Sequence, residues 1–465
     1  MKKAKLVFIP APGFSHLVST FEFAKRLCDR DRRFSVTFLI MNSLLDPPAV
    51  SFIESQQQQQ QQIIKLIHLP QPQQPPPDHL KPYPEIYKFT HRENYKPLVK
   101  HLLSNMMLST RAASNSVPQI AGLVLDFFTA PMVDVGHELG LPSYLFSTSN
   151  LALLDLTLYF LTHPTHVKES NPELTLPSFV NSVPASVLPA PVFSKEDGFV
   201  VTLKLAQKFM DMKGIIVNTF QELESYALLS FLDTKIPPVY PVGPVIGLSS
   251  STEMVDSAQN EKIMKWLDHQ PDSSVVFLCF GSMVKFGATQ LREIGIGLES
   301  SGYRFLWAMG GDSIHHDEDI LQEGLLDRTA EKGKICRWAP QVEVLAHKAI
   351  GGFVSHCGWN SILKSLWCGV PIVTWPIHAE QKLNAFKMVR ELGLAVEMRS
   401  KEVNGDDLVM MADEIKEAIS RVMDSDSEVR KRVQEMALKC KKAVMDGGSS
   451  HGYFARLIED IIANI

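Results

Sequence analysis

The chain has 465 residues, of which 45% are hydrophobic and 21% are charged, so its composition is that of a globular protein with a large core. This length is too great for one ordinary domain and suits two. The formal net charge of -5 and the pI near 6.3 argue against a nucleic-acid partner, because proteins that bind nucleic acids usually carry a basic stripe.

The N-terminal half begins with an alternation of strand and helix. Lys5–Ile9 is an apolar strand, Phe21, Ala24 and Leu27 recur at helical spacing, and Phe34–Ile40 is a second strand. This order is typical of a parallel sheet covered by helices. Further strands are predicted at 120–125 and 214–218.

The N-terminus does not have the pattern of a secretory leader, because Pro10 and Pro12 interrupt the first short apolar run. No apolar run anywhere reaches the roughly 18–20 residues that cross a bilayer. The six cysteines are scattered and form no Cys-x-x-Cys pair, which indicates reduced thiols rather than disulfides or a zinc site. We therefore expect a cytoplasmic protein without a membrane span.

Two low-complexity stretches, Gln56–Gln62 and Pro70–Pro84, predict a mobile surface loop. The best candidate for a linker is the proline-rich Pro237–Pro244 with the polar Gly247–Asn260. The predicted domains are therefore 1–245 and 246–450, with a last helix in 451–465 that packs back on the first domain.

The second half repeats the strand and helix pattern. Strands are predicted at 274–280, 303–309, 350–355 and 370–375, and helices at 288–300, 360–367 and 382–392. Ligands of such parallel sheets bind beyond the carboxyl ends of the strands. Two α/β domains of similar size therefore suggest a cleft between them.

The greatest concentration of side chains able to bind a ligand follows the strand Gly351–Ser355. There the residues His356-Cys357-Gly358-Trp359-Asn360-Ser361 begin a helix. Unpaired backbone N–H groups and the helix dipole make such a helix start attractive to anions, and a pyrophosphate fits it. An alternative remains open, in which Asn360 or Ser361 only caps the helix.

The segment Trp338–Gln381, WAPQVEVLAHKAIGGFVSHCGWNSILKSLWCGVPIVTWPIHAEQ, resembles without a gap the signature box of plant secondary-product glycosyltransferases. These are the plant members of family 1 UDP-glycosyltransferases. The segments APGFSHLVSTFEFAKRL, IVNTFQELE and FLCFGSM share the resemblance, and the opening segment is similar to the group that acts on flavonoids, other phenolics and terpenoids. The resemblance implies a GT-B fold of two Rossmann-like domains facing each other across a cleft, and UDP-glucose as co-substrate.

The resemblance also implies roles for the donor-site residues. Trp338 would stack on the uracil ring, the Ala339 backbone would read its edge, and Gln341 would reach the ribose. The phosphates would be held by His356, Asn360, Ser361 and Ser282, and the sugar would be contacted by Trp359, Glu380 and Gln381. Gln381 and Trp359 favour glucose within the family.

Three residues of the box depart from the family pattern. Lys364 stands where a glutamate usually accepts hydrogen bonds from both ribose hydroxyls, and a lysine only donates. Losing the hydrogen bonds that the glutamate accepts costs about 1.5–3 kcal/mol, which corresponds to roughly a ten- to a hundred-fold loss of donor affinity. His378 in place of tyrosine and Lys348 in place of proline are expected to matter less.

The catalytic candidates lie in the first domain. Sugar transfer requires the acceptor hydroxyl to lose a proton, and histidine titrates in the range that suits a base. His16 follows the first strand, and Asp126 ends the strand 120–125, so both belong to the same sheet edge. The resemblance assigns His16 as the base and Asp126 as its partner, although Ser15 replaces a usual glycine. From the residues alone, a surface role for His16 and a capping role for Asp126 remain open.

The resulting mechanism is a single displacement that inverts the anomeric carbon and gives a β-glucoside. No Asp-x-Asp pair lies near the phosphate site, so neither a metal nor another cofactor is expected. The acceptor is expected to lie beside His16 against apolar walls formed by Phe14, Phe127, Phe128 and Phe146, with 83–105 and 180–195 as pocket loops. Ordinary core packing remains the alternative for each phenylalanine. We expect a monomer.

Three other functions were considered. The sequence has no Gly-x-Ser-x-Gly elbow after a strand, which a serine hydrolase would need. It also has no Gly-x-Gly-x-x-Gly after the first strand, which a nicotinamide enzyme would need. A nucleotide-binding protein without catalysis is the more serious alternative, because Lys364 weakens the donor box.

Overall fold

The computed structural model describes residues 3–58, 63–112, 118–168, 172–231, 235–247, 257–282, 284–310, 325–398 and 409–465. The chain forms two compact units, one made of Met1–Gly247 together with Lys442–Ile465 and the other of Leu248–Lys441. The sequence had placed the corresponding divisions at 245/246 and 450/451. Among the described residues, no helix has the length and apolar character needed to span a membrane.

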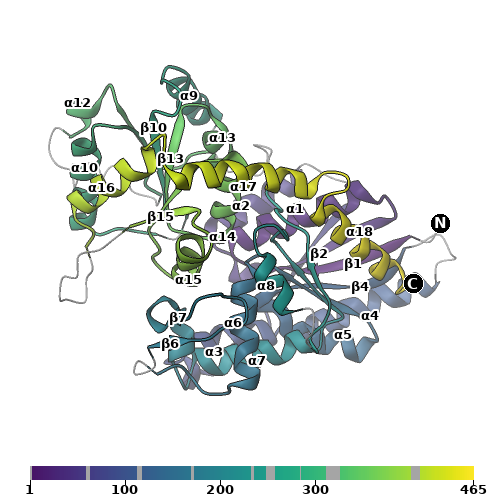
Figure 1. The fold of residues 1–465 in the computed structure, drawn as a ribbon. Helices are drawn as coiled ribbons and strands as arrows, with labels where there is room; N and C mark the ends of the chain where they lie inside the picture. The colour runs from purple at the N-terminus through teal and green to yellow at the C-terminus, as the bar shows by residue number, and fades with distance from the viewer. Residues whose placement is uncertain are drawn as a thin grey trace. The chain divides into compact units, whose positions relative to one another are not determined.

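The first unit is built on a seven-stranded sheet in the order β3-β2-β1-β4-β5-β8-β9. Its strands β1, β2 and β4 are labelled in Figure 1. All neighbouring strands are parallel. The strands are β1 (Ala4–Ile9), β2 (Phe34–Met41), β3 (Ile64–Leu69), β4 (Gln119–Asp126), β5 (Ser143–Ser147), β8 (Gly214–Val217) and β9 (Val239–Pro241).

Both faces of this sheet are buried. In β1, Val7 and Ile9 belong to one apolar core, and Leu6 and Phe8 belong to a second core on the opposite face. The helices of the unit are α1 (Phe14–Arg30), α2 (Pro47–Gln58), α3 (Pro84–Glu93), α4 (Lys96–Ala112), α5 (Val133–Leu139), α6 (Leu151–Thr162), α7 (Gly198–Met210), α8 (Ser225–Ser230) and α18 (Ser449–Ile462). The strands β6 (Glu173–Leu174) and β7 (Val183–Pro184) pair antiparallel and form a separate short hairpin.

The last helix, α18, belongs to the second of these cores through Phe454, Leu457 and Ile461. Asn464, just beyond it, donates to the Ala121 carbonyl at 3.0 Å and to the Tyr144 hydroxyl at 3.1 Å. These contacts tie the C-terminus to the first sheet.

The second unit contains a six-stranded parallel sheet in the order β12-β11-β10-β13-β14-β15. Its strands are β10 (Val275–Cys279), β11 (Arg304–Ala308), β12 (Gly333–Cys336), β13 (Ile350–Ser355), β14 (Ile372–Thr374) and β15 (Ala395–Glu397). Its helices are α9 (Ser257–Asp268), α10 (Ala288–Ser301), α12 (Leu325–Thr329), α13 (Gln341–Ala346), α14 (Trp359–Cys368), α15 (Gln381–Phe386) and α16 (Ala412–Met423), followed by α17 (Glu428–Val444), which runs on into the first unit.

The predicted strands and helices are present, with small shifts at their ends, and three segments differ. Gln56–Gln58 belong to the end of α2 rather than to a loop, and Gln59–Gln62 lie outside the described residues. The predicted linker is shorter than expected, because Val239–Pro241 form β9 of the first sheet and α9 begins at Ser257, while 248–256 lie outside the described residues. Most of the predicted pocket loop 83–105 is helical, in α3 and α4.

Candidate active site

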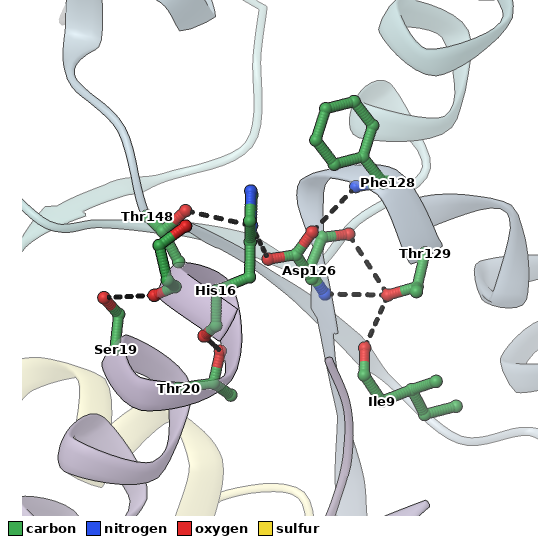
Figure 2. Close-up of polar contacts among 9 residues, drawn as sticks. Ile9, His16, Ser19, Thr20, Asp126, Phe128, Thr129 and Thr148 are labelled. Atoms are coloured by element: carbon green, nitrogen blue, oxygen red, sulfur yellow. Dashed lines mark hydrogen bonds and ion pairs between the residues drawn. The ribbon is translucent and has the colours of Figure 1, made fainter. Parts of the chain in front are cut away.

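The first candidate site lies where β1 and β4 end beside each other. The two strands are parallel neighbours with Ile9 opposite Leu125, so the residues that follow them meet at one sheet edge. His16 is in the first turn of α1 and Asp126 is the last residue of β4. The His16 Nδ1 atom lies 2.8 Å from Asp126 Oδ2 (Figure 2).

Asp126 is buried and both of its carboxylate oxygens are engaged. Oδ2 faces His16, and Oδ1 accepts a hydrogen bond from the Phe128 N–H at 2.9 Å. The Asp126 N–H donates to Thr129 Oγ1 at 2.9 Å, and that hydroxyl donates to the Ile9 carbonyl at 2.5 Å. The capping role left open by the sequence is therefore real, and it fixes the orientation in which the second oxygen faces the imidazole (Figure 2).

His16 is held from several directions. Its carbonyl accepts a hydrogen bond from Thr20 Oγ1 at 2.7 Å, and Thr148 Oγ1 lies 3.2 Å from Nδ1. With Nδ1 directed at a carboxylate, the neutral tautomer that carries its proton on Nδ1 leaves a lone pair on Nε2. The side chain is 25% exposed, so this imidazole is accessible to a small molecule. Thr148 was missed from the sequence because β5, which it follows, was not predicted.

The four phenylalanines proposed as acceptor walls lie in different surroundings. Phe128 is part-buried, and its ring centre lies 5.4 Å from that of His16. Phe127 is also part-buried and contacts Phe128 edge to face at 5.2 Å, while Phe14 packs against Phe52.

Phe146 differs from the other three. It is fully buried and stacks on Phe23 at 4.7 Å in the core. This corrects the expectation that Phe146 lines the acceptor site.

The second candidate site lies at the carboxyl edge of the other sheet, after β10, β12, β13 and β14. Between β13 and α14, Cys357 adopts a positive φ of 64°, so the chain turns sharply into the helix. The N-cap residue is Gly358, which has no side chain that could cap the helix. The alternative that Asn360 or Ser361 caps α14 is therefore wrong. Instead, Ser361 Oγ accepts a hydrogen bond from Gln341 Nε2 at 3.0 Å.

His356 is enclosed by glycines in this turn. A Cβ atom on Gly358 would lie 2.5 Å from His356 Nε2, and one on Gly281, whose φ is +79°, would lie 3.1 Å away. Burial, with a smaller contribution from the nearby His378, lowers the pKa of His356 to about 4. His356 is therefore neutral at pH 7. Its Nδ1 atom is buried and has no hydrogen-bond partner among the residues that the structure describes.

The remaining donor candidates surround the same edge. The Trp338 carbonyl accepts a hydrogen bond from Gln259 Nε2 at 3.1 Å, and Trp338 is part-buried. Gln381 Oε1 accepts from the N–H groups of Ile377 and His378, both at 3.0 Å, and so holds the loop that carries Glu380. Ala339 and Trp359 are buried, whereas Ser282, Lys364 and Glu380 are part-buried.

The carboxyl edge of this sheet therefore brings together an aromatic side chain, hydrogen-bond donors and the start of a helix. Within the described ranges, no cluster of three or more His, Cys, Asp or Glu side chains that could hold a metal ion was found.

Comparisons with known proteins show which proteins the chain is similar to. Residues 202–432 match the family model described as UDP-glucoronosyl and UDP-glucosyl transferase. The chain is 49% identical to UDP-glycosyltransferase 71K1 of Malus domestica, with 99% of each chain covered. It is 45% identical to flavonol 3-O-glucosyltransferase UGT71C4 of Arabidopsis thaliana, over 99% of this chain and 98% of the relative.

The fold is also similar to solved structures. The crystal structure of Medicago truncatula UGT71G1 complexed with UDP-glucose matches with a TM-score of 0.89 and 47% identity, over 99% of this chain and 98% of that one. Since both units have the expected α/β architecture, the predicted fold class is confirmed.

Proposed function

The chain belongs to the family of UDP-glycosyltransferases, and on that premise we propose that it transfers glucose from UDP-glucose to a hydroxyl group of a small flavonoid, phenolic or terpenoid acceptor, with inversion at the anomeric carbon. The observation that carries this proposal is the 2.8 Å contact of the accessible His16 with the buried Asp126. The bound UDP-glucose of the Medicago truncatula structure and the flavonol activity in the name of the Arabidopsis thaliana relative support the substrate classes.

On the acceptor side, His16 Nε2 removes the proton as the hydroxyl oxygen attacks the anomeric carbon. Asp126 keeps the proton of the neutral ring on Nδ1 and stabilises the imidazolium that forms. Because the attacking oxygen and the leaving UDP are on opposite faces of the sugar, an α-linked donor gives a β-glucoside.

On the donor side, the charge of the leaving diphosphate is stabilised by the start of α14, whose N-cap is Gly358, and by hydrogen-bond donors around it. The phosphate ligands are His356, Asn360, Ser361 and Ser282; the nucleoside ligands are Trp338, Ala339 and Gln341; and the sugar ligands are Trp359, Glu380 and Gln381. We propose that these groups act without a metal ion. We also propose a cytoplasmic monomer, and the absence of any Cys-x-x-Cys pair in the sequence supports a reducing compartment.

The test is to incubate the protein with UDP-glucose and a panel of flavonoids, simple phenols and terpenoid alcohols in the presence of EDTA. Mass spectrometry would show the gain of one hexose, and the anomeric proton coupling of the product would show the β configuration. A product of the α configuration would contradict the single displacement. Binding of UDP without any product would instead favour a nucleotide-binding protein without catalysis.

Lys364→Glu is expected to strengthen the use of UDP-glucose, because a carboxylate at this position of α14 can accept hydrogen bonds from the ribose hydroxyls. The expected decrease in donor KM is about ten- to a hundred-fold. The measurement is donor KM at saturating acceptor, with Lys382→Glu as a control for charge alone, since Lys382 is an exposed lysine of α15 in the same unit. An unchanged or higher KM for Lys364→Glu would contradict the assignment.

UDP-glucose binding is expected to be independent of pH between about 6 and 8, because a His356 whose pKa is about 4 stays neutral over that range. If the bound diphosphate raises that pKa, affinity would increase only as the pH falls toward 4. Calorimetry in the His378→Asn background, which removes the neighbouring imidazole, isolates this effect. A loss of affinity as the pH rises from 6 to 7.5 would show that His356 binds as a cation.

A further inference from the structure

Arg92 lies beside the catalytic pair, although neither the sequence patterns nor the proposed mechanism uses it. It is in the last turn of α3, and its guanidinium carbon lies 5.1 Å from the centre of the Phe128 ring. The same ring lies 5.4 Å from the centre of the His16 imidazole. One aromatic side chain thus contacts both the base and a cation.

The guanidinium has an unusual environment for an arginine. Its Nε atom is buried and has no hydrogen-bond partner in the part of the chain that the structure describes. Burial lowers the pKa of Arg92, and two carboxylates, Asp126 and Glu85, oppose that shift by attraction. A cation that loses water without gaining a hydrogen-bonded anion is destabilised.

Both of these carboxylates are bound elsewhere. Asp126 binds His16 and the Phe128 N–H, and Glu85 pairs with Lys88 at 2.8 Å. The cation–π contact with Phe128 offsets only part of the desolvation. Since Arg92 is still partly exposed, an anion that enters with the acceptor can reach it.

We propose that Arg92 binds a carboxylate of the acceptor, so that the preferred substrates are hydroxylated aromatic acids whose phenolic hydroxyl faces His16. The planar guanidinium matches a carboxylate through two parallel hydrogen bonds. The separation of the Arg92 guanidinium from the His16 imidazole is at most the sum of the two ring distances, so a phenolic acid is long enough to reach both groups. The acceptor ring would lie against Phe128. This assignment rests on the proposed glucosyl transfer.

The test compares two acceptors that differ only in charge, 4-hydroxycinnamate and its methyl ester, with UDP-glucose as donor. The enzymes are the unmodified protein, Arg92→Gln, Arg92→Lys and the control Lys100→Gln, which removes an exposed cation from α4 that pairs with neither Asp126 nor Glu85. The ratio of kcat/KM for the acid to that for the ester is the quantity measured. Thermal unfolding of each variant checks its fold, and Arg92→Lys retains the charge if Arg92→Gln does not fold.

The unmodified protein is expected to prefer the acid and to form a phenolic glucoside that resists mild alkali rather than a glucose ester. In Arg92→Gln the preference should fall by about ten- to a hundred-fold, with the ester little affected. Arg92→Lys should retain part of the preference, and Lys100→Gln all of it.

An equal loss with both acceptors in Arg92→Gln would show a purely structural role and overturn the assignment, as would a lack of preference in the unmodified protein. Absence of transfer to either acceptor and to every member of the wider panel would contradict the proposed function itself. The two failures are therefore distinguishable.

Discussion

Replacing His16 with alanine is expected to lower kcat by about a hundred- to ten-thousand-fold, because the acceptor hydroxyl would then have to lose its proton to water. UDP-glucose binding should be unchanged, since the donor candidates belong to the other unit of the chain. The fold should also tolerate the change. The imidazole is one quarter exposed, and α1 is held by its own buried residues, among them Leu17, Phe21 and Leu27.

The measurement is single-turnover product formation together with calorimetric UDP-glucose affinity. His137→Ala is the matched control, because it removes an exposed histidine from α5 in the same unit. A His16→Ala variant that retains more than about one tenth of kcat would exclude His16 as the base. A variant that loses donor affinity to the same extent as kcat would show that the substitution acts on binding rather than on proton transfer.

The sequence was informative about the sheet edge that carries His16 and Asp126, because parallel strands end on the same side of their sheet. His16 follows β1 and Asp126 ends β4, so their shared edge could be predicted. Their direct contact could not, because it depends on β1 and β4 being neighbours although β2 and β3 lie between them in the chain. It also depends on the Phe128 N–H, which turns the carboxylate toward the imidazole.

Phe146 shows why strand-end aromatics were harder to place. In β5, Tyr144 and Phe146 pack into one core and Leu145 into the other. A strand buried on both faces lacks the polar alternation that tells one side from the other. Its position at a strand end therefore could not show that the Phe146 side chain points to Phe23.

Arg92 was missed for a different reason. It lies in a segment that the sequence suggested to be a pocket loop, whereas α3 is a helix whose start is bound by Asp197 through the Glu85 and Ile86 N–H groups. Asp197 is more than a hundred residues from the start of α3 in the sequence, so no local sequence pattern indicated where that helix begins. The position of a cation near Phe128 is thus a consequence of tertiary packing.

The second large effect is expected for Asp126→Asn, with a fall in kcat of about a thousand- to ten-thousand-fold and little change in either KM or thermal stability. Asparagine keeps the shape of the buried side chain. The Phe128 N–H donates to Oδ1 at 2.9 Å, so the new amide keeps its oxygen there and places its NH₂ group at the position of Oδ2. That group would face His16 Nδ1, 2.8 Å away, as a donor rather than an acceptor.

An amide that donates to Nδ1 selects the imidazole tautomer that carries its proton on Nε2. In that tautomer Nε2 has no lone pair with which to remove the proton of the acceptor hydroxyl. Nitrogen NMR of His16 should therefore show the proton on Nδ1 in the unmodified protein and on Nε2 in Asp126→Asn. Asp134→Asn is the control, because it removes a carboxylate that pairs with Lys96 and Lys208 in the same unit. A fall in kcat without a change of tautomer would mean that Asp126 acts by stabilising the imidazolium, and unchanged kcat would show that it does not assist His16.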